Sequence, residues 1–219
     1  MPDDSASARA STVDRWTAAL AESTGSPGGG AASGVMLAIA YSLTSMVAGY
    51  TSVSDSLADE LSALRARATA GRKTALLLAD SDAAASESFG SAFRLKPHEG
   101  RADAIRDASV EAAHASADLG KQGAAAVGDL EWLAEHGKPA LIADVAVACG
   151  ALRAAVAGAR ANVNFDLSAL ESGSAGSSAP VAEEHPVLWE TVQELDAVLA
   201  RIDRLAAEIE GRDRLNPGE

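Results

Sequence analysis

Asp82 is the side chain whose surroundings in the sequence best suit proton transfer. Ser86, Phe89 and Phe93 follow it at steps of four, three and four residues, so all four share one face of a helix. Apolar and aromatic neighbours can raise the pKa of a carboxyl group toward the range used in general acid–base catalysis. A solvated carboxylate beside core aromatics would show the same spacing, so Asp82 is a candidate catalytic residue.

A glycine-rich turn is the second feature that can bind a ligand. It reads Gly25-Ser26-Pro27-Gly28-Gly29-Gly30 and leads into a stretch without charged residues. The glycines let backbone N–H groups converge at a helix N-terminus, where the partial positive charge attracts carboxylate, phosphate or polarised carbonyl groups. An ordinary tight turn would use the same residues, and the spacing alone does not separate the two interpretations.

Asp144 and Asn162 mark the ends of a third feature. They are eighteen residues apart, which is five helical turns, so they lie on one stripe of a helix. The residues between them on this stripe are small: Ala148, Ala151, Ala155 and Gly158. Such a trough either receives another helix, which is the commoner use, or forms the floor of a ligand cleft.

The remaining reactive residue types do not form a pattern. His98, His114, His136 and His185 lack metal-ligand spacing, and HExxH, CxxC and Walker-type sequences are absent. Cys149 lies in an apolar run and is interpreted as a small buried hydrophobe. We expect no metal ion, no cofactor and no bound nucleotide.

Basic residues gather around Pro97. They are Arg94, Lys96, Arg101 and Arg106. In an acidic protein such a cluster can receive the carboxylate of a ligand, although a solvated helix end is the commoner explanation. The net charge of -13 repels phosphate backbones and no basic stripe offsets it, so we expect no nucleic-acid partner.

Long helices must position these groups. Only 4% of the 219 residues are aromatic, alanine is abundant, and windows that alternate with period two are few. We therefore predict an all-α fold, a multihelical bundle of long antiparallel helices packed on small residues. One face carries Gly30, Gly34, Ala38, Ser42, Ser45 and Gly49, which predicts a packing seam or a dimer seam.

The predicted organisation is one domain with tails. Residues 1–10 are expected to be a flexible tail and residues 11–170 the helical core, with a capping box at Ser11 and helices over about 54–93, 99–133 and 139–170. The first of these is expected to be one long helix that only Gly71 interrupts, either with or without a kink there. Residues 171–184 are expected to be a flexible loop, 185–212 an amphipathic helix and 213–219 a tail.

The last helix has a heptad pattern. Leu188, Leu195, Ile202 and Ile209 recur every seven residues, which predicts a seam that covers a helix of the same or another chain. The N-terminus is not a secretory signal, and the charge-free segment before Ser54 lacks flanking basic residues and a strong aromatic belt. We expect no membrane span and a cytoplasmic protein.

The three features, in this order, resemble the cyclodeaminase/cyclohydrolase family, which comprises the cyclodeaminase domain of formiminotransferase-cyclodeaminase and stand-alone methenyltetrahydrofolate cyclohydrolases. The resemblance runs from about Trp16 to Leu167. Its motifs are the turn at Ser26 to Gly30, Met46-Val47 with Thr51, Asp82 with Ala85 and Phe93-Arg94-Leu95, Gly137 with Asp144, and Asn162-Val163. The sequence departs from the family pattern at Ser86, Lys138 and Asp166, where the family has Phe, Asn and Asn, and Pro97 is displaced.

The resemblance implies an all-helical homodimer that binds a tetrahydrofolate derivative and needs no metal. It implies hydrolysis of methenyltetrahydrofolate or loss of ammonia from formiminotetrahydrofolate, with Asp82 as the proton-transferring residue and Asp144 as a second candidate. Pro27, Gly28, Gly29, Gly30 and Asn162 would position the folate, and Arg94 or Lys96 would meet its glutamate tail. The alternative is a degenerate relative that keeps the bundle and binds a ligand or a protein partner without catalysis.

Overall fold

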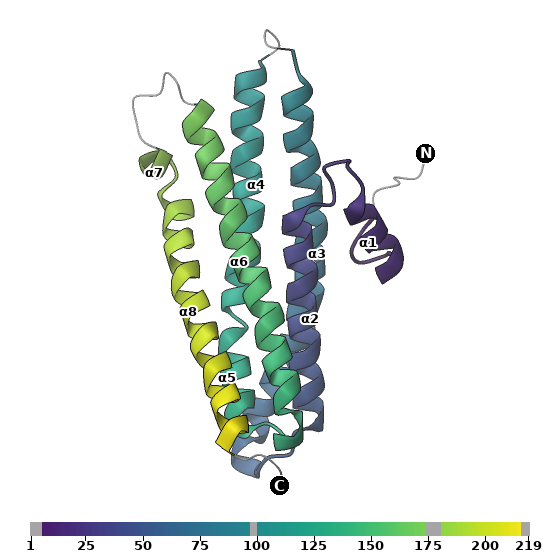
Figure 1. Ribbon diagram of the computed structural model, residues 1–219, viewed down its shortest axis with the longest axis vertical. Helices are drawn as coiled ribbons and strands as arrows, with labels where there is room; N and C mark the ends of the chain where they lie inside the picture. Colours follow the sequence, from purple (N-terminus) through teal and green to yellow (C-terminus); the bar gives the residue numbers. More distant parts are fainter. Residues whose placement is uncertain (1–5, 97–99, 174–180, 216–219) are drawn as a thin grey trace.

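The computed structural model describes residues 6–96, 100–173 and 181–215, and this part of the chain is helical without strands. The elements are α1 (Val13–Ala21), α2 (Gly29–Tyr50), α3 (Asp55–Arg94), α4 (Arg101–Ala124), α5 (Val127–His136), the 3₁₀ turn η1 (Pro139–Leu141), α6 (Ile142–Gly173), α7 (Val181–Glu184) and α8 (Pro186–Leu215). The predicted all-α bundle is confirmed. Helices α2, α3, α4, α6 and α8 run side by side along the long axis, and α1 lies beside α3 (Figure 1).

Helices α2 and α3 pack closely because small residues face each other. A Cβ placed on Gly34 would lie 2.7 Å from the Cβ of Ala79, and one on Gly71 would lie 2.5 Å from the ring of Tyr41. Helix α3 runs through Gly71 as one element, as the single long helix predicted. This glycine makes room for the Tyr41 ring of α2.

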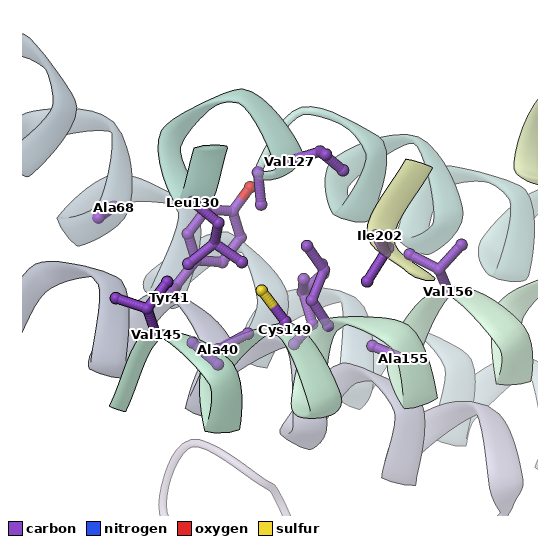
Figure 2. Packing of buried hydrophobic residues seen from close by; sticks show 14 of the residues in the cluster. Ala40, Tyr41, Ala68, Val127, Leu130, Val145, Cys149, Ala155, Val156 and Ile202 are labelled. Atoms are coloured by element: carbon purple, nitrogen blue, oxygen red, sulfur yellow. The ribbon is translucent and has the colours of Figure 1, made fainter. Parts of the chain in front are cut away.

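The core combines aliphatic side chains with one buried tyrosine. Figure 2 shows Tyr41 among Leu130, Val145 and Cys149, with residues from several helices meeting at the same place. The Tyr41 hydroxyl donates to the carbonyl oxygen of Gln122 at 2.8 Å and accepts from Nε2 of the same residue at 2.7 Å. Cys149 is buried, as predicted, and burial raises the pKa of its thiol to about 11.

The helix predicted over residues 99–133 is two helices. Helix α4 ends at Ala124 and α5 begins at Val127. Gly120 and Gly123 lie within α4, and their missing side chains make room for Leu195 and Val156. Pro139 opens the short turn η1 before α6, which differs from the single helix expected from residue 139 onward.

Helix α8 covers α6 and α4 of its own chain. The heptad residues Leu188, Leu195, Ile202 and Ile209 are buried against them. Ion pairs flank this seam: Arg153 and Arg160 of α6 pair with Asp203 and Asp196, and Arg201 pairs with Glu131 of α5. The heptads therefore serve intrachain packing in this structure.

The segments outside the core differ in part from the expectation. Ser7 and Ala8 donate hydrogen bonds to the carboxylate of Asp80, at 2.8 and 2.6 Å, so part of the N-terminal segment is attached to α3. The first helix is capped by Thr12 rather than by Ser11. Pro97, His98, residues 174–180 of the expected loop and residues 216–219 of the expected tail lie outside the described residues.

Two segments are long and apolar enough to cross a membrane by length and composition, α2 and Pro139–Glu171. Both are packed into the bundle. In the most apolar 18-residue stretch of each segment, 56% of the residues are buried in α2 and 33% in Pro139–Glu171. Helix α6 therefore presents an apolar face that this chain does not cover.

The close approach of α2 to α3 predicts opposite effects for one substitution at two glycines. Gly34→Ala should lower the free energy of unfolding by about 1–3 kcal/mol, because its Cβ would overlap Ala79. Gly49→Ala on the same helix, where nothing lies within 4 Å, should raise it slightly. Urea denaturation followed by circular dichroism measures both, and a Gly34→Ala protein as stable as the parent would contradict the packing.

Candidate active site

A cavity of about 300 Å³ lies where the N-terminus of α2 meets α3, α4 and α6. Asp82 and Ser86 of α3, Ser116 of α4, and Asn162 and Asp166 of α6 supply its polar groups. Gly25 and Gly28 to Gly30 form another wall, and Phe89 and Phe165 contribute aromatic surface. The Asp82 face of α3 and the glycine-rich turn therefore meet in one place, together with the Asn162 end of the stripe on α6.

The Asp82 carboxyl group is buried at the start of α2. Only 4% of the residue is exposed, and Oδ1 accepts a hydrogen bond from the Ser116 hydroxyl at 3.3 Å. The other oxygen, Oδ2, is buried without a hydrogen-bond partner of good geometry among the described residues. Burial raises the pKa of Asp82, and the hydroxyl of Ser116, the N–H of Ala31 and the hydroxyl of Ser86 partly oppose that shift.

Gly30 is required by the position of Asp82. A Cβ on this glycine would lie 2.0 Å from Oδ1 of Asp82. The turn before it is held by the Ser26 hydroxyl, which donates to the carbonyl oxygen of Ala83 on α3 at 2.8 Å. Pro27 is buried within this turn but does not line the cavity. The glycine turn thus brings the N-terminus of α2, with its free N–H groups, against a carboxylate.

Asp166 is a second buried carboxyl group in the cavity, with 7% of the residue exposed. It lies one helical turn after Asn162, so both side chains project from the same face of α6. Burial, and secondarily the charge of Asp82, raise the pKa of Asp166 to about 7. Two carboxyl groups with raised pKa values therefore share one cavity.

The stripe on α6 is mainly a packing surface. Ala148 and Ala155 are fully buried, and a Cβ on Gly158 would lie 2.1 Å from the Ser33 hydroxyl oxygen of α2. Only the Asn162 end of the stripe reaches the cavity. Asp144 lies in the first turn of α6, roughly 27 Å from Asn162 along the helix at about 1.5 Å per residue.

Asp144, the second candidate for proton transfer, therefore lies away from Asp82 within this chain. Asp144 does not line the cavity, and the carboxyl group that accompanies Asp82 is that of Asp166. The physical reason is the length of α6, because its two ends reach opposite ends of the bundle, and Asn162 and Asp166 lie near the end that meets the turn of α2.

The basic residues lie outside the cavity. Arg94 is exposed at the end of α3 and donates to the Ser91 hydroxyl at 2.8 Å. Its Nη1 lies 3.5 Å from the position of a Cβ on Gly90, a residue that lines the cavity, so this guanidinium is near the rim. Lys96 is exposed beyond the end of α3 and is not a lining residue.

No group of three or more His, Cys, Asp or Glu side chains that could hold a metal occurs in the described ranges. The described lining residues of the cavity also include no Lys, Arg or His. The chemistry available from these residues is therefore proton transfer by carboxyl groups and orientation by hydroxyl, amide and N–H groups.

Comparison with known proteins gives a family. A family model described as formiminotransferase-cyclodeaminase matches residues 12–177, about three quarters of the chain. This chain belongs to that family. A solved structure titled formiminotetrahydrofolate cyclodeaminase, from Thermotoga maritima, has 24% sequence identity and a TM-score of 0.78, covers 93% of this chain and is itself covered over 98% of its length. A search of curated proteins gave no match.

Three residues at which the sequence departs from the expected family motifs lie at different places in the structure. Ser86 and Asp166 line the cavity. Lys138 does not line it: its backbone N–H donates to the Thr51 hydroxyl at 3.2 Å, and its ammonium group lies 5.8 Å from the centre of the Tyr50 ring.

Ser116 and Phe165 were not found by sequence reasoning. Ser116 lies in an alanine-rich helix without a neighbouring polar residue on its face that would single it out, and Phe165 follows Asn162 by three residues. For Asp166, the step of four from Asn162 is a sequence signal that places both residues on one face of a helix.

The raised pKa of Asp166 predicts how stability depends on pH. Between its ordinary value of 3.8 and about 7, the unfolded chain ionises this group while the folded protein keeps its proton, so the free energy of unfolding falls as the pH rises through this range. Asp166→Asn removes this titration. Its stability relative to the parent should increase from pH 4 to pH 8 by on the order of 2–4 kcal/mol.

Denaturant titrations at several pH values measure this difference. Asp118→Asn, at an exposed carboxylate of α4, is the matched control and should show no comparable trend. A constant difference between Asp166→Asn and the parent across the pH range would contradict the raised pKa.

Proposed function

We propose that this protein is a folate one-carbon enzyme. It acts on methenyltetrahydrofolate as a cyclohydrolase, or on formiminotetrahydrofolate as an ammonia-eliminating cyclodeaminase, in the cytoplasm and without a metal or cofactor. The observation that carries the proposal is the buried Asp82 carboxyl group, which has one unpartnered oxygen and faces a cavity beside the N-terminus of α2. Membership of the formiminotransferase-cyclodeaminase family supports the choice of substrate.

Both reactions change bonds at one carbon that is bonded to two nitrogens. In methenyltetrahydrofolate both are folate nitrogens, and in formiminotetrahydrofolate one is a folate nitrogen and the other is the imino nitrogen that leaves as ammonia. In the hydrolysis, water attacks this carbon and the base takes a proton from the water. A carbon–nitrogen bond then breaks as the nitrogen receives a proton and the hydroxyl loses one, which leaves the formyl compound and one proton released to solvent. In the deamination, a folate nitrogen attacks the carbon, loses its proton, and ammonia leaves after receiving one.

Asp82 is suited to these transfers. Its raised pKa brings the carboxyl group closer to neutral pH, where a group that both accepts and donates a proton works best. Its Oδ2 atom is buried beside the cavity and lacks a hydrogen-bond partner of good geometry among the described residues, so it would accept a hydrogen bond from a ligand N–H that reached it. Asn162 and the N–H groups after Gly28 would orient the folate ring, and Arg94 at the rim would meet the carboxylates of the glutamate tail.

The cyclohydrolase proposal predicts that the protein accelerates the loss of methenyltetrahydrofolate absorbance above the spontaneous rate. Asp82→Asn keeps the shape of the side chain but removes the base, and should lower kcat by about 10²- to 10⁴-fold. Asp80→Asn on the same helix is the control, because Asp80 binds Ser7 and Ala8 and does not line the cavity. Equal rates for Asp82→Asn and the parent would exclude Asp82 as the base.

Assays with the two substrates distinguish the two reactions from each other and from a non-catalytic family member. If the parent protein does not accelerate methenyltetrahydrofolate loss, ammonia release from formiminotetrahydrofolate is measured with the same variants. A protein that is inactive with both substrates would be the non-catalytic family member, whose cavity binds a ligand without turnover. Ser86 and Asp166 in the cavity are the observations that favour this alternative.

We also infer a homodimer formed through the uncovered face of α6. Val147 and Phe165 are 60% and 65% exposed, and the exposed Gly150 and Ala161 continue the same apolar face. Ile39 and Met46 add exposed apolar side chains on the neighbouring helix α2. An apolar surface that spans two helices is typical of a self-association interface. Phe165 also lines the cavity, so the interface would adjoin the site.

The dimer predicts a specific effect of charge on α6. Val147→Glu should shift the protein from dimer to monomer in size-exclusion chromatography with light scattering, because it buries an unpaired charge in the interface. Val187→Glu on α8, at a residue that is 56% exposed, is the matched control and should leave the dimer intact. A parent protein that is monomeric at 100 µM would rule out this interface.

A further inference from the structure

The cavity has an unusual charge arrangement for a site of its size. It contains two carboxyl groups, Asp82 and Asp166, which are 4% and 7% exposed, in a space of about 300 Å³. No cationic side chain is among the described residues that line it. Because two negative charges cannot be buried together without compensation, either a proton or a cationic ligand must accompany them.

We propose that Asp166 makes this cavity selective for a planar amidinium cation, which takes the place of the proton that the free Asp82–Asp166 pair retains. The proposal rests on the proposed function to this extent: the one-carbon unit between two nitrogens in both proposed substrates is an amidinium group. It goes beyond that function because it assigns a charge preference and a pH dependence to a residue at which this chain departs from its family pattern.

The hydrogen-bonding groups of the cavity agree with a cation. Oδ2 of Asp82 is a buried acceptor without a hydrogen-bond partner of good geometry among the described residues, and Asp166 supplies a further acceptor in the same cavity. An amidinium group presents N–H donors in one plane with a delocalised positive charge, so carboxylates bind it by charge-assisted hydrogen bonds. The side chains of Phe89 and Phe165 provide aromatic surface for the flat ligand, and aromatic faces attract cations.

The pair titrates where a cation can displace its proton. Burial and the charge of Asp82 raise the pKa of Asp166 to about 7, so the pair loses its remaining proton near neutral pH. Below that pH a cation competes with the bound proton, and above it the pair is fully ionised and attracts the cation more strongly. Affinity for an amidinium should therefore increase with pH, whereas affinity for a neutral analogue should not.

Other ionisable groups around the pair do not supply this pH dependence. Helix α2 has no acidic or basic side chain. On α3, α4 and α6 the ionisable neighbours are Asp80, Glu87, Glu111, His114, Asp118 and Arg160. Asp80 accepts hydrogen bonds from Ser7 and Ala8, and Arg160 forms an ion pair with Asp196 of α8. The remaining neighbours on α3 and α4, and Glu190 and Glu194 of α8, are exposed. Histidine ordinarily titrates between pH 5 and 8, so His114 needs a control.

The test uses benzamidine, which is a cation throughout the pH range, and benzamide, its neutral analogue of the same shape. Affinities are measured by NMR titration of the whole protein at pH 5.5 and pH 8.5. We expect the parent to bind benzamidine at least fivefold more tightly at pH 8.5 than at pH 5.5, and to bind benzamide with less than a twofold change. Asp166→Asn should reduce the benzamidine change to less than twofold, and His114→Gln should retain it.

The outcomes distinguish this proposal from the proposed function. Benzamidine binding that is independent of pH in the parent, or a pH effect that persists in Asp166→Asn, would overturn the role of Asp166 even if the enzyme turns over a folate. A pH effect that Asp166→Asn abolishes supports the proposal even if both folate assays are negative. The unfolding transition of each variant is recorded at both pH values, and Asp166→Ser serves as the second substitution if Asp166→Asn does not fold.

Discussion

The contact between Gly30 and Asp82 is the constraint on which the rest of the site depends. Helix α2 approaches α3 so closely at its first turn that the Asp82 carboxyl group occupies the space of a side chain at residue 30. The same close approach continues at Gly34 against Ala79 and at Gly71 against the Tyr41 ring. Because each glycine places the backbone of one helix directly against a side chain of the other, the contacts leave little freedom for the two helices to slide, and the carboxyl group is held in place.

The same packing accounts for the electrostatics of the cavity. A carboxylate at a helix N-terminus is ordinarily stabilised in its charged form. Here burial opposes that effect at Asp82, and the second carboxyl group at Asp166 adds repulsion within a small space. The structure compensates in part through hydroxyl and N–H donors and leaves one oxygen of Asp82 unpartnered. A site with this arrangement is prepared for a proton or for a ligand that brings positive charge.

Stability and chemistry are located in different parts of the bundle. The larger apolar cluster includes Tyr41 and Leu130 (Figure 2), which do not line the cavity, and α8 packs on it through Leu195, Ile202 and Ile209. The cavity at the start of α2 is lined by glycines, polar side chains and the rings of Phe89 and Phe165. Function at one end of α2 is thus supported by a core that does not take part in it.

The sequence by itself determined the helical class, most helix positions, the importance of Asp82 and the glycine turn, and the family, because periodicity and short motifs are local properties. It could not determine why α3 has a glycine at residue 71, since only the Tyr41 ring from α2 explains that glycine. It also named Asp144 as the second candidate carboxylate, whereas Asp166 is the one that shares the cavity with Asp82. A stripe on α6 is defined by spacing, but which end of it meets Asp82 depends on how α6 lies against α2 and α3, and that is decided by packing between residues far apart in the chain. Asp166 and Ser116 joined the site for the same reason, because a residue acquires its burial and its charged neighbours only when the helices are assembled.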